Sequence, residues 1–89
     1  MLIRSQDRLR LVNTENIDTL AIELGSFHIY SFLGNESTLL GKYSTEEKAV
    51  KVLDMIQESY IANKGYYLSG SKSKTSYVFY MPQDDEVEL

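Results

Sequence analysis

The chain of 89 residues has no cysteine, one histidine, one proline and no long apolar run. Without cysteine it can form neither a disulfide framework nor a thiolate metal site, which fits a reducing cytoplasm. No stretch approaches the roughly 20 apolar residues that a membrane-spanning helix needs. Arg4 and Asp7 leave no room for the apolar region of a signal peptide. We therefore expect a cytoplasmic protein without a membrane segment.

Positive charge is also scarce. Nine Lys and Arg residues stand against thirteen Asp and Glu residues, which gives a net charge of -4. A net negative chain is a poor general binder of nucleic acid, so we regard nucleic acid as an unlikely partner. The length predicts one domain, near the size at which a partner or a second copy often adds stability.

The residues that carry catalysis or hold cofactors are few. A lone His28 excludes the metal sites that need two histidines and leaves one possible base for a nucleophile. The glycines never form a phosphate-binding pattern between a strand and a helix start. We predict no catalytic, cofactor-binding or metal-binding residue, and therefore no enzyme.

The strongest local pattern is a capped amphipathic helix between residues 43 and 65. Ser44 and Glu47 have the spacing of a capping box, and Gly65 can close a helix in the left-handed conformation. Between them one face of a helix carries the apolar residues Ala49, Val52, Leu53, Ile56 and Tyr60.

Alternating apolar residues between turn formers predict strands on both sides of this helix. The expected strands cover residues 2–4, 17–24, 27–33, 38–43 and 77–81, and residues 9–12 either extend or pair with the first. This is an α+β fold: a two-layer sandwich in the order ββββαβ, with a mainly antiparallel sheet of about five strands and the helix on one face. Residues 1–82 form the domain, and residues 83–89 form an acidic, frayed tail. The expected core is Leu20, Ile22, Leu24, Phe27, Ile29, Leu40, Val52, Leu53, Ile56 and Phe79.

Aromatic residues are the one surplus, with seven tyrosines and three phenylalanines. One helix covers only one face of a sheet, and an aromatic patch on the other face usually marks a contact surface. The candidate interaction surface is Tyr30, Phe32, Tyr77 and Tyr80. The alternative is that the N-terminal segment and the loops pack over these residues.

Four blocks of sequence carry a resemblance that covers nearly the whole chain. They are residues 3–7, residues 40–43 with 45–49, residues 52–53 with 56–57, and residues 78–82. In this order they resemble a group of short proteins of uncharacterised function from Gram-positive bacteria, their phages and mobile elements. The resemblance implies a phage, prophage or mobile-element origin, and it implies no activity, ligand or site residue.

These observations leave three hypotheses for function. The first is an accessory protein that binds another protein, or a second copy of itself as a homodimer, through the aromatic surface. The second is a binder of nucleic acid or a nucleotide ligand, with charge from Arg4, Arg8, Arg10, Lys72 and Lys74 beside Tyr66, Tyr67 and Tyr77. The third is an acidic mimic of nucleic acid that inhibits a host enzyme through residues 84–86 and Glu88.

Overall fold

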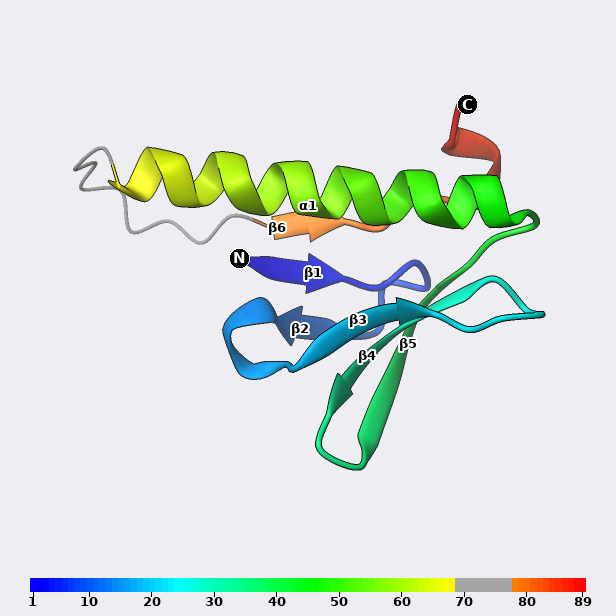
Figure 1. Cartoon of the computed structure of the whole chain (residues 1–89), viewed down its shortest axis with the longest axis horizontal. Helices are drawn as coiled ribbons and strands as arrows, with labels where there is room; N and C mark the ends of the chain where they lie inside the picture. The colour runs from blue at the N-terminus through cyan, green and yellow to red at the C-terminus, as the bar shows by residue number, and fades with distance from the viewer. Residues whose placement is uncertain (69–77) are drawn as a thin grey trace.

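The computed structural model describes residues 1–68 and 78–89, with the backbone alone for residues 63–68. This part of the chain contains six strands, one long helix and two short 3-10 helices (Figure 1). They are β1 (Leu2–Arg4), β2 (Leu11–Asn13), η1 (Thr14–Asn16), β3 (Thr19–Ile22), β4 (His28–Leu33), β5 (Glu36–Lys42), α1 (Glu46–Leu68), β6 (Val78–Tyr80) and η2 (Asp84–Glu86). The α+β class with one helix is confirmed.

The described strands form two sheets of three strands each. In the first sheet β1 lies between β2 and β6, antiparallel to β2 and parallel to β6. In the second sheet β3, β4 and β5 form an antiparallel meander. The single sheet of about five strands is not confirmed, because the six described strands are divided between two sheets.

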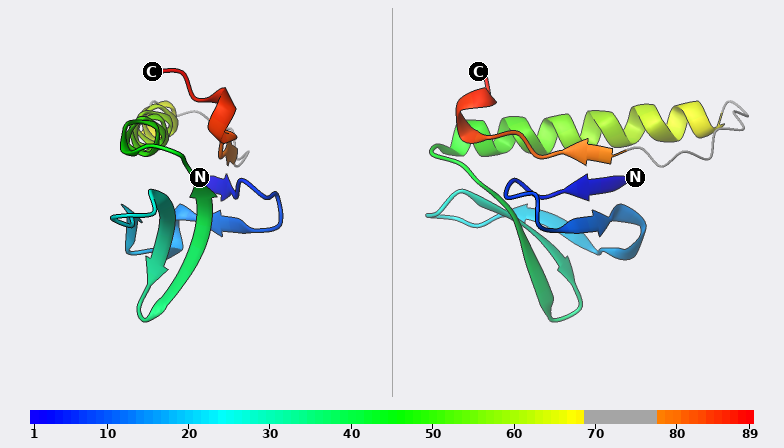
Figure 2. Two further views of the ribbon diagram at one scale, coloured as in Figure 1. Left: turned by 90° about the vertical axis from the view of Figure 1, so that its right-hand side faces the viewer. Right: turned by 180° about the vertical axis from the view of Figure 1, so that it is seen from behind.

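The helix lies along one side of the first sheet, beside β6 and β1 (Figures 1 and 2). Ile3 of β1 and Phe79 of β6 are directly opposite each other in the parallel pair, and both are buried. Ala49, Val52 and Ile56 are buried and lie on one face of α1, at the spacing that the sequence pattern predicted.

The core is formed by residues of β1, β4, β5, α1 and β6, together with Tyr43 and the segment after β6. Its buried apolar members are Ile3, Ile29, Leu40, Tyr43, Ala49, Val52, Ile56, Phe79, Met81 and Val87. Leu20, Ile22, Phe27 and Leu53, which we also expected in the core, are partly buried against it. Leu24 is not part of the core and is exposed. The Glu23 amide donates to the His28 carbonyl, so the strand ends before Leu24 and this side chain stands in the turn.

Both predicted ends of the helix differ from the observed ones. Thr45, not Ser44, is the N-cap: its hydroxyl accepts from the Lys48 amide at 3.1 Å, and its carbonyl accepts the first helical bond from Ala49. The helix also continues past Gly65 to Leu68. A glycine inside a helix costs only about 1 kcal/mol relative to alanine, so it does not force an end.

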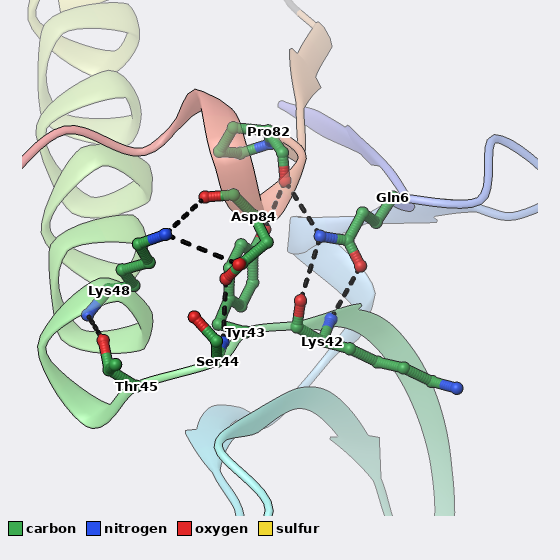
Figure 3. Close-up of polar contacts among 8 residues, drawn as sticks. All are labelled: Gln6, Lys42, Tyr43, Ser44, Thr45, Lys48, Pro82 and Asp84. Atoms are coloured by element: carbon green, nitrogen blue, oxygen red, sulfur yellow. Dashed lines mark hydrogen bonds and ion pairs between the residues drawn. The ribbon is translucent and has the colours of Figure 1, made fainter.

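The Ser44 backbone N–H donates its hydrogen bond to Asp84 of the C-terminal segment and not to Glu47 (Figure 3). Asp84 accepts from this amide at 2.8 Å and forms an ion pair with the Lys48 ammonium at 3.4 Å. The bond from the Ser44 amide, with a smaller contribution from Lys48, lowers the pKa of Asp84 below its ordinary value.

Residues 83–89, for which the sequence predicts a frayed tail, contain η2 and bury Val87 to 7% exposure. The Gln83 amide donates to the Glu86 carboxylate at 2.8 Å, which closes a capping box around η2. Buried Val87, and the Asp84 carboxylate that binds the Ser44 amide and Lys48, hold a segment whose composition is otherwise that of a solvated tail.

A glutamine side chain joins the two sheets (Figure 3). The Gln6 amide group accepts from the Lys42 backbone N–H at 2.7 Å and donates to the Lys42 carbonyl at 3.1 Å, as a neighbouring strand would. It also donates to the Pro82 carbonyl, which the Tyr43 hydroxyl reaches as well at 2.7 Å. Burial raises the pKa of Tyr43 above its ordinary value, with smaller effects from Asp84 and Glu86.

Candidate functional site

The outward face of β4 carries a row of three rings. His28, Tyr30 and Phe32 alternate with the buried residues Ile29 and Ser31. Neighbouring ring centroids are 6.3 Å and 6.2 Å apart, within the usual range for aromatic contacts. Tyr30 is partly buried, whereas Phe32, at 36% exposure, is among the exposed residues.

The first sheet has a second candidate face, on the side away from α1. The strand register places Arg4, Leu11 and Tyr80 in one row across this face, and Leu2, Asn13 and Val78 in the next. Directly opposed residues point to the same side of a sheet, and Ile3 between the two rows is buried on the other side. We call this surface, together with Arg8 and Leu9 of the β1–β2 hairpin, the arginine face.

Three large apolar side chains of the arginine face are exposed. Leu9 is 80% exposed, Tyr80 57% and Leu11 49%. The hairpin loop that carries Leu9 curls away from α1 (Figure 2, left). An apolar cluster left exposed by the described residues of the domain is typical of a contact surface.

The hairpin loop is held by an internal network around Ser5, which is 1% exposed. The Ser5 hydroxyl donates to the Asp7 carboxylate at 2.6 Å and accepts from the Arg10 amide at 3.0 Å. The Asp7 carboxylate also accepts from the Leu9 amide at 2.9 Å. The Ser5 hydroxyl first, and then the Leu9 amide and the Arg10 charge, lower the pKa of Asp7.

Arg4 and Arg8 lie next to Tyr80. The Arg8 guanidinium lies 5.9 Å from the centroid of the Tyr80 ring, a cation–π distance. Arg4 Nη1 donates to the Arg8 carbonyl at 3.3 Å, and Arg4 Nε is buried without an acceptor among the described residues. Arg10 pairs with Asp7 at 3.5 Å.

The structure divides the predicted interaction surface. Tyr30 and Phe32 lie together on β4, whereas Tyr80 lies on β6 in the other sheet. Tyr77 lies outside the described residues, as do the side chains of Tyr66, Tyr67, Lys72 and Lys74 of the alternative basic patch. Leu9 and Leu11 were missed. The signal for them was the Arg-Leu-Arg-Leu alternation over residues 8–11, in which a strand must expose either its leucines or its arginines.

A groove of about 370 Å³ lies between α1 and the segment of η1 and β3. Its size falls within the range of ligand pockets, and its walls are mainly apolar, with Ile17, Leu20, Leu53 and Ile56. Its one charged side chain, Asp18, accepts from the Gly34 amide at 3.1 Å. A smaller hollow of about 280 Å³ lies beside Tyr30 and Phe32. Polar residues also line both spaces: Thr14, Thr19, Gln57 and Tyr60 in the groove, and Glu23 and Ser37 in the hollow.

Among residues 1–68 and 78–89, no three acidic or histidine side chains lie close enough together to hold a metal ion. No helix in the same residues combines the length and the apolar character needed to cross a membrane. Comparisons with protein-family models, with curated proteins and with solved structures found no match.

Proposed function

We propose that this chain is a non-enzymatic, cytoplasmic accessory protein of phage or mobile-element type, and that it acts by binding another protein or a second copy of itself through the arginine face. The observation that carries the proposal is a row of exposed Leu11 and Tyr80 on either side of Arg4, with Arg8 over the Tyr80 ring and exposed Leu9 in the adjoining hairpin. Interfaces typically combine aromatic and arginine side chains with an apolar centre.

The placement of α1 supports a two-layer arrangement in which the helix covers one side of the first sheet and a partner covers the other (Figure 2). On this arrangement the face of β4 is the weaker candidate, because its rings pack against one another and Tyr30 is partly buried. Of the predicted aromatic surface, Tyr80 is then the member that contacts the partner.

A matched pair of double variants tests this proposal. Leu9→Ser with Tyr80→Ser removes two exposed apolar side chains from the arginine face, and Phe32→Ser with Leu33→Ser removes two from β4. Exposed substitutions of this kind usually change stability by less than about 0.5 kcal/mol, and circular dichroism checks that both variants fold.

Affinity capture from a Gram-positive lysate with mass spectrometry, and sedimentation velocity of the purified protein, then report binding and self-association. We expect the wild type and the β4 variant to retain a specific partner or a dimer, and the Leu9/Tyr80 variant to lose it. Equal binding by all three proteins, or loss in the β4 variant alone, would show that the arginine face is not the contact surface.

The acidic mimic of nucleic acid stays a less favoured prediction. Asp84, one of the four acidic residues that motivate it, already binds the Ser44 amide and Lys48. Deletion of residues 83–89 is therefore a poor test, because it also removes buried Val87 and the bonds of Asp84.

A further inference from the structure

We propose that the partner of the arginine face presents an acidic peptide segment with at least one apolar side chain, so that its carboxylates bind Arg4 and Arg8 and its apolar residue packs on Tyr80, Leu9 and Leu11. This inference rests on the proposed function and adds the chemistry of the partner to it.

The charge distribution supports an anionic partner. All three arginines of the chain fall within residues 4–10, although the chain as a whole has a net charge of -4. Among the described residues, Arg10 is the one arginine that forms an ion pair, with Asp7. Arg4 and Arg8 therefore keep unneutralised guanidinium groups on this face, and a guanidinium binds a carboxylate through two parallel hydrogen bonds.

The backbone of Arg8 supports a role in binding. Its φ of 71° lies in the left-handed region, where glycine is favoured and other residues are strained. A long cationic side chain at such a position costs stability, and strain of this kind is concentrated at functional sites. The guanidinium of this strained residue lies beside the Tyr80 ring of the arginine face.

The hydrogen bonds of the hairpin favour a specific site over a merely charged surface. The bonds of Ser5 and Asp7 fix the loop before a partner arrives, so less conformational entropy is lost on binding. Leu9 in this loop is 80% exposed. An aliphatic side chain offers nothing for a nucleic-acid base to stack on, and Tyr80 is the single exposed ring among the described residues of this face, which favours a peptide over nucleic acid.

Selection of random dodecapeptides displayed on phage against the immobilised full-length protein tests the partner chemistry. We expect the selected peptides to combine Asp or Glu with Leu, Ile or an aromatic residue, and to bind more weakly as salt rises. Neutral or basic selected sequences, or no enrichment, would overturn the inference. Salt-sensitive binding of labelled oligothymidine to this face without peptide enrichment would also overturn it and would assign the face to nucleic acid.

The variant Arg8→Gly separates binding from folding. Glycine relieves the positive φ, so we expect a melting temperature equal to or above that of the wild type. Binding of a selected acidic peptide, measured by fluorescence anisotropy, should weaken roughly tenfold or more because a charged hydrogen-bonding group is lost. Lys51→Gln on the exposed side of α1 removes the same charge and should leave binding unchanged.

Two results would contradict the inference at this residue. A lower melting temperature with unchanged peptide binding would make Arg8 a structural residue, and equal losses in the Arg8 and Lys51 variants would reduce the effect to net charge. If peptide binding is not acidic but the Leu9/Tyr80 variant still loses its protein partner, the proposed function stands and this inference alone fails.

Discussion

Gly41 and Tyr43 should be energetically coupled, because the glycine leaves the space that the tyrosine ring fills. A Cβ at Gly41 would lie 2.9 Å from Tyr43 Cε2, 3.0 Å from its hydroxyl oxygen and 3.2 Å from Met81 Cε. The ring cannot move aside freely, since its hydroxyl donates to the Pro82 carbonyl at 2.7 Å. We expect Gly41→Ala to cost roughly 1–3 kcal/mol of unfolding free energy, as overpacking of a buried site does.

Tyr43→Phe removes the hydroxyl and its bond. This change alone should cost about 0.5–1.5 kcal/mol, because the Pro82 carbonyl keeps the Gln6 amide as a donor. The ring is then free to shift away from the new methyl group, so the double variant should lose roughly 0.5–1 kcal/mol less than the sum of the single losses.

Urea unfolding followed by circular dichroism, with linear extrapolation, measures all four proteins of this cycle. Gly34→Ala is the control, because its Cβ meets no atom within 4 Å and its cost comes from a φ of +60°. Its effect should add to that of Tyr43→Phe. Additivity of the Gly41 and Tyr43 changes within about 0.5 kcal/mol would refute the idea that the hydroxyl bond holds the ring against Gly41.

Two further predictions concern the C-terminal segment. Val87→Ala should cost about 1.5–2.5 kcal/mol in urea unfolding, from lost burial and a residual cavity, whereas Leu89→Ala, at a side chain that is 76% exposed, should cost almost nothing; equal small effects would mean that the segment is frayed. Asp84→Ala should lower the melting temperature at neutral pH, and Asp85→Ala should not. Because the pKa of Asp84 is lowered in the folded protein, its contribution is present above the unfolded value of 3.8 and is lost as pH falls through the folded value. The gap between Asp84→Ala and wild type should therefore close in acid, and a gap that persists there would contradict the assignment.

The sequence was informative wherever the determining interactions are local. The apolar stripe of Ala49, Val52 and Ile56 does bury one face of α1, because residues three and four apart always share a helix face. The inward and outward sides of β4 also alternate as predicted from Ile29 to Phe32, because the period of a strand is fixed at two residues.

The sequence-based predictions were wrong where a residue contacts another that is distant in sequence. Nothing near Ser44 indicates that Asp84, forty residues later, accepts from its amide, so the local capping box with Glu47 was the simpler expectation. In the same way, the acidic composition of residues 83–89 hides the burial of Val87. Local propensity cannot predict either contact, because both depend on where the chain returns after β6.

The division of the predicted aromatic surface follows from one irregularity in β5. Ile29 pairs with Gly41 and Tyr30 with Leu39, so Leu40 is an extra residue at a bulge, and its carbonyl accepts from the Gln6 backbone N–H at 2.7 Å. A bulge bends its strand and interrupts the ladder, and beyond it β5 pairs with the Gln6 side chain instead of with a further strand. The two sheets therefore meet at a junction without merging into one sheet. Tyr30 and Tyr80 consequently lie on separate sheets, and the arginine face lies on the side of β1 that α1 does not cover.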